Sequence, residues 1–454
     1  MKKQSVVIIG AGLSGLAAAA FLSKAGFQTK IFERTAYIGG RCRSVLYGDS
    51  EFGKYPFDVG PIFSGLNVVK LIKERLKEEI AFKIAPVKIH IFSKGKCPIT
   101  IPPSFSELRK TGLSIFETIS LSYRLWKQKQ FDAYSYMSSH HDIACFLTKN
   151  QFMRNIFNMR AGLFHGCLPD DMPGYTFNPK GYGRPFYPLG GMQSIPDTLL
   201  NIIKKYNGEI YTTAPVDKIL IKNNKALGVL VHGESVRADF IISSVSIVQT
   251  VLKLCKDTKF NSIFLNQIKS YKQGLQASMV FMIVDKAKIN VEHGNVLYVY
   301  LPPYDLNKTM HQLFKGIYPD EPPFGVFLTR GNEAFRPATL LFYTPKGETN
   351  KQRLIQEAER LVEKAALFIP KFTSSILWKK TVTSLDYPHE IGFKSCVLPV
   401  AESKGYKKMP FKLPVKNLFN VGSSVLPAGG GTVQAVKSGL QCAEFIYSSA
   451  EKSF

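Results

Sequence analysis

A glycine-rich turn near the N-terminus constrains the fold of this chain more than any other feature. Residues 5–9 (SVVII) form a β-branched run typical of a buried parallel strand, and the turn GAGLSG follows at residues 10–15. Residues 13–25 favour a helix, and residues 29–32 favour a second strand that ends at Glu33. Strand, turn, helix and strand in this order predict the βαβ unit of a dinucleotide-binding fold.

Each glycine of the turn has its own physical role. Gly10 permits the tight turn, Gly12 lets the backbone approach a pyrophosphate, and Gly15 allows close packing of the helix on the strand. The pyrophosphate would lie on the exposed N–H groups at the start of the helix, where the helix dipole favours negative charge. Glu33 fits the same site, because its carboxylate can accept hydrogen bonds from ribose hydroxyls. A glycine-rich turn without a nucleotide is the alternative.

The length and the charge of the chain bound its domain count and its partners. With 454 residues the chain exceeds the size of one simple core, so two domains are expected. The formal net charge of +25 attracts phosphate, nucleic acid or an anionic membrane surface, or it reflects a lysine-rich surface without one partner. The lysines are dispersed and no nucleic-acid-binding signature accompanies them, so no specific nucleic-acid partner is expected.

Cysteine and histidine spacing argues against a metal site. The seven cysteines are scattered without a C-x-x-C pair, and the eight histidines lack ligand spacing. We therefore expect no metal, no disulfide framework and a cytoplasmic location. Residues 2–22 loosely imitate a signal peptide, but glycines interrupt their apolar run. No run reaches the roughly 20 uninterrupted apolar residues of a membrane span.

Helical and strand patterns alternate along the rest of the chain. Amphipathic helices are predicted over residues 66–76 and 105–131, and the C-terminal part returns to strand, glycine turn and helix. The other predicted helices cover residues 195–206, 351–368 and 432–447. The other predicted strands cover residues 209–213, 216–222, 226–231, 238–243, 278–284, 296–300 and 417–421.

Several motifs resemble those of FAD-dependent amine oxidases and carotenoid desaturases. Residues 38–44 (IGGRCRS) are similar to the G-G-R-x-x-S segment of that group, although Tyr37 stands where its members often have arginine. Residues 57–61 (FDVGP) resemble its D-x-G-P turn, and residues 187–192 (YPLGGM) resemble the Y-P-x-G-G-M segment of phytoene desaturase-like proteins. The chain thus resembles the phytoene desaturase, carotenoid isomerase and retinol saturase group of the amine oxidase-like superfamily.

The C-terminal part extends the resemblance. Residues 214–219 (APVDKI) resemble the strand whose main chain meets the adenine, and residues 417–443 resemble the flavin motif of the group. In that motif, the helix after the glycine loop 427–431 points its first N–H groups at the pyrimidine edge of the flavin ring. The resemblance implies FAD, and we expect it to be held noncovalently because no cysteine or histidine spacing indicates covalent attachment. The cofactor-binding residues it implies are Gly10, Gly12, Leu13, Ser14, Gly15, Glu33, Arg34, Gly39, Gly40, Arg41, Val216, Gly422, Gly431, Thr432 and Val433.

The fold class that follows is α/β, with a discontinuous Rossmann-type FAD-binding domain and a mixed α+β substrate domain. The FAD-binding domain is expected to comprise residues 1–65, 186–250 and 401–454. The substrate domain is expected to comprise residues 66–185 and 251–400.

The reaction is less constrained than the cofactor, because flavins carry hydride and electron chemistry themselves. The resemblance implies a desaturase, saturase or isomerase acting on an apolar polyene- or isoprenoid-like substrate. The alternatives are an amine oxidase-type flavoenzyme on a smaller substrate and a nonenzymatic FAD protein that binds membrane or nucleic acid. His389 is a candidate acid or base, and a structural role is its alternative.

Residues 105–131 combine apolar and basic side chains at roughly helical spacing. A basic amphipathic helix can lie on an anionic membrane surface, which makes peripheral membrane association one interpretation. The alternative is a substrate-domain helix that packs on its own core.

Overall fold

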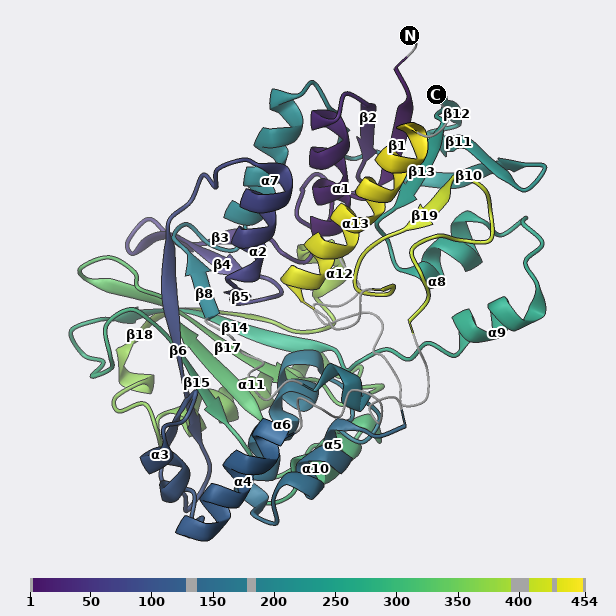
Figure 1. The fold of residues 1–454 in the computed structure, drawn as a ribbon. Coiled ribbons are helices and arrows are strands. Elements are labelled where there is room, and N and C mark those ends of the chain that lie inside the picture. The colour runs from purple at the N-terminus through teal and green to yellow at the C-terminus, as the bar shows by residue number, and fades with distance from the viewer. Residues whose placement is uncertain (1–2, 128–136, 178–184, 393–407, 427–430, 452–454) are drawn as a thin grey trace.

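Strand β1 (Ser5–Ile9) lies at the centre of a parallel sheet assembled from three distant parts of the chain. The computed structural model describes residues 3–127, 137–177, 185–392, 408–426 and 431–451. β1 pairs in parallel with both of its neighbours, and Figure 1 shows this sheet in the upper half of the molecule. The strand order is β19 (Leu418–Asn420), β13 (Phe240–Ser243), β1, β2 (Gln28–Phe32) and β9 (Glu209–Tyr211).

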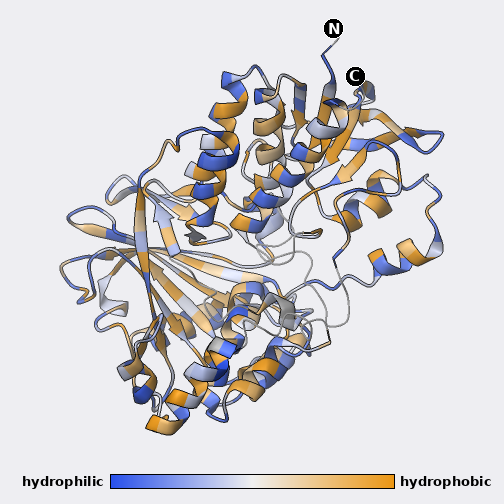
Figure 2. Ribbon diagram, in the orientation of Figure 1, coloured by the Kyte–Doolittle hydropathy of each residue, from blue (hydrophilic) through white to orange (hydrophobic). Residues whose placement is uncertain are grey.

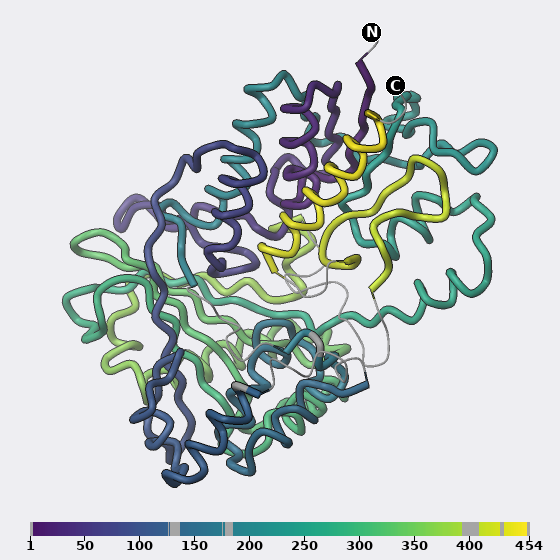
Figure 3. Tube along the Cα trace, in the orientation of Figure 1, coloured from purple at the N-terminus to yellow at the C-terminus, as the bar shows by residue number. Residues whose placement is uncertain are grey.

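Helix α1 (Leu13–Lys24) is buried on nearly all sides because many of its residues are small. It packs against α7 (Ser194–Lys205) and α13 (Thr432–Glu451). A Cβ added at Gly439 of α13 would lie 2.1 Å from the Ser14 carbonyl oxygen, so the approach of the two helices requires glycine there. Figure 3 shows the purple N-terminal helix and the yellow C-terminal helix side by side.

The larger sheet has nine strands and both of its faces are covered. β14 (Ala277–Asp285) is almost entirely buried, with Phe281 in the main core and Met282 in a second core formed with α11 (Lys351–Ala365). Alternate side chains of a strand point to opposite faces, so β14 contributes to both cores. The strand order is β18 (Ile376–Val382), β14, β17 (Phe335–Tyr343), β16 (Phe324–Leu328), β15 (Asn295–Tyr300), β6 (Ile84–Phe92), β8 (Pro185–Pro188) and β5 (Ser64–Gly65), and β7 (Ile99–Ile101) pairs with β6.

Smaller elements complete the fold. β3 (Ser44–Asp49) and β4 (Gly53–Asp58) form a hairpin. β10 (Val216–Lys222), β11 (Lys225–Val231) and β12 (Glu234–Arg237) form an antiparallel sheet. The other described α-helices are α2 (Asn67–Leu71), α3 (Phe105–Lys110), α4 (Ile115–Lys127), α5 (His140–Leu147), α6 (Gln151–Met159), α8 (Ile247–Gln249), α9 (Ser262–Lys269), α10 (Leu306–Phe314) and α12 (Tyr387–Glu390). π-Helical turns span Ile72–Leu76, Arg160–Phe164 and Thr250–Leu254, and 3₁₀ turns span Gly174–Thr176 and Thr373–Ser375.

The prediction of one continuous helical stretch over residues 105–131 is wrong. The structure has two helices there, α3 and α4, because Gly112, which follows the C-cap Thr111 of α3, adopts a left-handed conformation with φ of +89°. Residues 128–131 lie outside the described residues. Among the described helices, none combines the length and the apolar character needed to cross a membrane.

Substitution Gly439→Ala tests the close approach of α13 to α1. Alanine usually stabilises a helix relative to glycine, but here its methyl group would collide with the α1 backbone. We expect the free energy of unfolding to fall by about 1–3 kcal/mol, the usual cost of overpacking. The matched control is Ser448→Ala, at an exposed position of the same helix, which should change stability by less than about 0.5 kcal/mol. Chemical denaturation measures both, and equal stability of the two variants would contradict the close approach.

Candidate functional site

The N-terminus of α1 presents unpaired backbone donors. Its N-cap, Gly12, is extended, no side chain caps the helix, and no acidic residue stands in the first turn. The N–H groups of Leu13 and Ser14 donate to no acceptor among the described residues, whereas the N–H of Gly15 donates to the Ser244 hydroxyl at 3.0 Å. Unpaired N–H groups at a helix N-terminus attract anions, so this turn fits a phosphate group.

The predicted glycines come together around this helix start. A Cβ added at Gly15 would lie 2.3 Å from the Gly10 carbonyl oxygen, so the turn folds tightly onto the first residues of α1. Gly39 forms a parallel bridge with Gly12, and a Cβ added at Gly40 would lie 3.2 Å from the Gly12 Cα. Backbone therefore packs on backbone at this point, and side chains are kept away from the unpaired N–H groups.

The Glu33 carboxylate holds the glycine turn in place. Glu33 is 6% exposed, and its oxygens accept the N–H of Ala11 at 2.8 Å and the N–H and hydroxyl of Thr35, each at 2.9 Å. A carboxylate has about four lone-pair sites, so it can accept one further donor such as a ribose hydroxyl. The Glu33 carbonyl also accepts the N–H of Ala214, which brings Val216 of β10 close to this end of β2. The sequence pattern indicated a ligand contact at Glu33 and missed its internal role.

The two predicted arginines lie in different surroundings. Arg34 is exposed, and its Nη2 donates to the carbonyl of Gly392 at 2.8 Å, close to α12. Arg41 is partly buried, and its Nη2 lies 3.4 Å from the Ser423 hydroxyl, next to Gly422. Arg41 thus connects the double-glycine segment to the C-terminal motif.

The C-terminal motif reaches the same helix start. Gly422 has a φ of +118°, and a Cβ there would lie 3.2 Å from the Ser14 hydroxyl oxygen. Thr432, the first residue of α13, has its hydroxyl 2.6 Å from that of Ser64, and Val433 packs on the main core. The residues predicted from both ends of the chain are therefore neighbours in space.

The remaining predicted residues are only partly placed. Residues 427–430 of the glycine loop lie outside the described residues, and Gly431, directly before α13, has a φ of +86°. His389 is exposed on α12, whereas Tyr387 of the same helix is buried and its hydroxyl donates to the Val59 carbonyl at 3.3 Å. The role of His389 stays a prediction.

Asp58 ties three motif segments together from inside the protein. It is 3% exposed, and its Oδ1 accepts the Ser44 hydroxyl at 2.6 Å and the Met192 N–H at 2.9 Å. Burial raises the pKa of Asp58 from 3.8 to about 6, although hydrogen bonds from Ser44 and Met192 oppose the rise. The sequence pattern indicated a turn here, and only the fold shows that the carboxylate joins the segments.

The raised pKa of Asp58 predicts a pH-dependent stability. The folded state binds the Asp58 proton more tightly than the unfolded state does. The resulting contribution to folding stability is therefore fully present below about pH 4 and is lost as the pH rises through about 6. Between those limits we expect the free energy of unfolding of the wild type to fall by about 3 kcal/mol. The variant Asp58→Asn has no carboxyl group there to titrate, so it should not show this fall. Urea denaturation across this pH range measures the difference. The control is Asp217→Asn, an exposed position, and it should follow the wild-type curve. Parallel curves for wild type and Asp58→Asn would refute the assignment.

The structure buries two histidines, His140 and His165, which their spacing in the sequence did not indicate. His165 follows Phe164, whose ring meets that of Phe63 edge to face with centroids 5.6 Å apart. Burial, assisted by the positive charge of Arg160, holds the pKa of His165 well below its usual range. The same two causes lower the pKa of His140 to about 3, so both imidazoles are neutral near pH 7. No group of three or more metal-binding side chains occurs within the described ranges.

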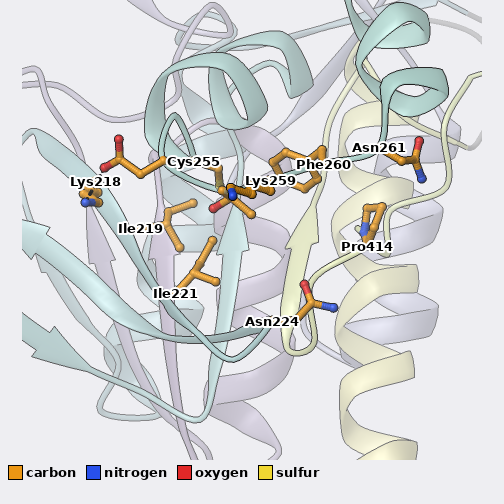
Figure 4. A pocket seen from close by; sticks show the side chains of 11 residues that line it. Lys218, Ile219, Ile221, Asn224, Cys255, Lys259, Phe260, Asn261 and Pro414 are labelled. Carbon is orange, nitrogen blue, oxygen red and sulfur yellow. Dashed lines mark ion pairs between the residues drawn. The ribbon is translucent and has the colours of Figure 1, made fainter.

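A pocket of about 500 Å³ lies apart from the predicted cofactor-binding residues. Figure 4 shows side chains of β10 on one side of it and Cys255, Lys259 and Phe260 on the other. Lys218 at its edge forms an ion pair with Asp257. None of the predicted cofactor residues lines this pocket, so it is separate from the candidate site.

Comparison with known proteins identifies the family. The model of the flavin-containing amine oxidoreductase family matches residues 13–446, so the chain belongs to this family, which implies a flavin cofactor. The chain is 26% identical to 1-hydroxycarotenoid 3,4-desaturase from Flavobacterium sp. (strain P99-3), over 60% of this chain and 62% of that protein. It is 24% identical to 4,4'-diapophytoene desaturase (4,4'-diapolycopene-forming) from Methylomonas sp, over 62% and 61%. The chain thus spans about three fifths of the length of these curated relatives.

Solved structures share the α/β fold. An oxidoreductase from Methanosarcina mazei has a TM-score of 0.71 and 20% identity, covering 97% of this chain and 100% of that chain. Wild-type putrescine oxidase bound to putrescine has a TM-score of 0.68 and 13% identity, covering 98% and 99%. At such identities the similarity concerns the fold alone.

Proposed function

We propose that this protein binds FAD noncovalently and acts as an FAD-dependent oxidoreductase on an apolar polyene- or isoprenoid-like substrate, as a desaturase, saturase or isomerase. The observation that carries the proposal is the convergence of three segments on the N-terminus of α1. These segments are the glycine turn 10–15, the double-glycine segment 39–41 and the C-terminal segment at Gly422. A glycine-lined helix start at the end of a parallel strand is the usual site for the pyrophosphate of a dinucleotide.

The chain offers a partner for each part of FAD. The N–H groups of Leu13 and Ser14 would hold the pyrophosphate, Glu33 would accept a ribose hydroxyl, and the main chain at Val216 would meet the adenine. The first N–H groups of α13 would face the pyrimidine edge of the flavin ring. When bound, the flavin supplies the hydride and electron chemistry. The residues of the chain would position the flavin, and the glycines would keep side chains away from its phosphates.

The domain division is part of the proposal. A Rossmann-type FAD-binding domain would comprise residues 1–65, 186–250 and 401–454, and residues 66–185 and 251–400 would form the substrate domain. In support, all five strands of the parallel sheet fall within the first three segments. β5 and β8, at the edges of those segments, pair within the larger sheet.

A polyene substrate is favoured over an amine because of the relatives. The curated relatives are carotenoid desaturases by name, whereas the match to an amine oxidase is structural and at 13% identity concerns the fold. We include in the proposal a peripheral encounter with an anionic membrane surface, since a long polyene dissolves in lipid rather than in water.

Flavin content tests the cofactor assignment. The purified protein should show a flavin absorption spectrum and release FAD on acid precipitation. Substitution Gly15→Ala places a methyl group against the Gly10 carbonyl oxygen and should lower flavin affinity by roughly tenfold or more. The control is Gly325→Ala, whose added methyl group would make only an ordinary 3.4 Å contact with Leu297, and it should keep the wild-type flavin content. A colourless protein that takes up no added FAD would sink the proposal.

The substrate class is tested separately on the flavin-loaded protein. Under anaerobic conditions we expect polyenes to be converted, with products resolved by chromatography, or to bleach the flavin band. Primary amines should leave that band unchanged. Bleaching by amines, with release of hydrogen peroxide in air, would instead favour the amine oxidase-type activity.

A further inference from the structure

Helix α4 carries an apolar stripe that faces away from the protein. Its inward residues, Thr118 and Leu121, are fully buried. On the opposite face Phe116 is 85% exposed, Ile119 is 53% exposed and Tyr123 is 56% exposed. These residues recur three or four positions apart, so they form one continuous stripe on the helix surface. Large apolar side chains gathered at one exposed site mark an interaction surface more often than chance exposure does.

Neighbouring helices extend the stripe into a larger surface. The Arg124 guanidinium of α4 donates from Nη1 to the carbonyl of Phe146 at 2.6 Å and lies 5.5 Å from the ring centre of that residue on α5. Helix α3 packs beside α4 and adds an exposed phenylalanine. We name the set the apolar tip; it comprises Phe105, Ile115, Phe116, Ile119, Tyr123 and Phe146. Figure 1 shows α3 and α4 at the lower end of the molecule, far from α1 and α13, and Figure 2 shows hydrophobic residues at the outer end of α4.

Positive charge surrounds the apolar tip. Arg109 and Lys110 end α3, Arg124 lies on α4, and all three are exposed. These helices carry two carboxylates, Glu107 and the exposed Glu117, and both accept hydrogen bonds at a helix N-terminus. Glu107 accepts the N–H groups of residues 100 and 104, and Glu117 accepts the N–H of Ser114 at 2.8 Å. The carboxylates thus cap the helices, and the three cations outnumber them, so the rim of the tip carries a net positive charge.

We infer that the apolar tip docks on the surface of an anionic phospholipid bilayer. Its aromatic and aliphatic side chains enter the boundary between headgroups and acyl chains, and the basic rim contacts the lipid phosphates. The net charge of +25 on the whole molecule also favours an anionic partner. A second copy of the chain is a poorer occupant, because a symmetric contact would bring two basic rims together.

This inference extends the membrane part of the proposed function by naming the residues that meet the lipid. It places the larger sheet, and not the parallel sheet, next to the bilayer. Vesicle binding is measured without substrate or turnover, so its failure is distinguishable from failure of the flavin assignment.

The first experiment is sedimentation of the full-length protein with vesicles. Wild type should bind vesicles of phosphatidylcholine with phosphatidylserine and bind those of phosphatidylcholine alone much more weakly. The double variant Phe116→Ser with Ile119→Ser should lose roughly tenfold in affinity, since two inserted apolar groups are removed. The matched control is Ile263→Ser with Leu367→Ser, because these residues are 80% and 82% exposed but lie outside the tip. The control should bind as wild type does.

The second experiment separates the local charge from the overall charge. Arg109→Gln with Lys110→Gln should weaken binding to the anionic vesicles by roughly tenfold, and added salt should reduce the wild-type affinity. Lys253→Gln with Lys256→Gln removes the same amount of charge from exposed positions outside the tip and should have a smaller effect. Thermal unfolding checks that all variants keep the wild-type fold.

Three results would overturn the inference. Wild type could fail to bind either kind of vesicle, or the tip variants could bind as tightly as their controls. A dimer in light scattering that Phe116→Ser with Ile119→Ser dissolves, without any vesicle binding, would assign the tip to a second copy instead.

Discussion

Contact between backbones around α1 is the constraint on which the rest of the structure depends. Gly15 folds onto Gly10, Gly40 lies on Gly12, and Gly439 of α13 lies on Ser14, each at a distance that leaves little or no room for a side chain. These contacts bring segments from both ends of the chain to one helix start. They also leave the N–H groups of Leu13 and Ser14 without an acceptor among the described residues, so the packing that holds the fold together also produces a helix start that suits an anion.

Buried carboxylates give this arrangement its geometry. Glu33 holds the glycine turn through three hydrogen bonds, and Asp58 joins Ser44 to Met192 across the molecule. Burying a carboxylate is costly unless donors surround it, and the raised pKa of Asp58 reflects that cost. The two donors to Asp58, the Ser44 hydroxyl and the Met192 N–H, come from different motifs. The Asp58 carboxyl oxygen therefore acts as a connector, because it accepts hydrogen bonds from both segments.

The two ends of the molecule present opposite chemistry. The start of α1, beside the parallel sheet, offers backbone donors suited to phosphate, and the far end of the larger sheet carries the apolar tip with its basic rim. Between them the larger sheet is buried on both faces, with alternate residues of β14 in two separate cores. A sheet covered on both sides is a stiff spacer. The distance between the two surfaces is thus set by packing and not by a linker.

Local sequence pattern by itself determined the βαβ unit, the glycine turn, the place of Glu33 at the end of the second strand, and most of the strands of the parallel sheet and the helices packed on it. These features follow from strand period, helix composition and turn glycines, which act over a few residues. Local pattern did not separate α3 from α4, and it revealed few strands of the larger sheet, whose alternating residues face two cores. Only the tertiary structure decided that Asp58 connects three motifs, that His140 and His165 are neutral, and that Phe116 faces outward. These properties depend on burial and on neighbours distant in the chain, and no local pattern carries that information.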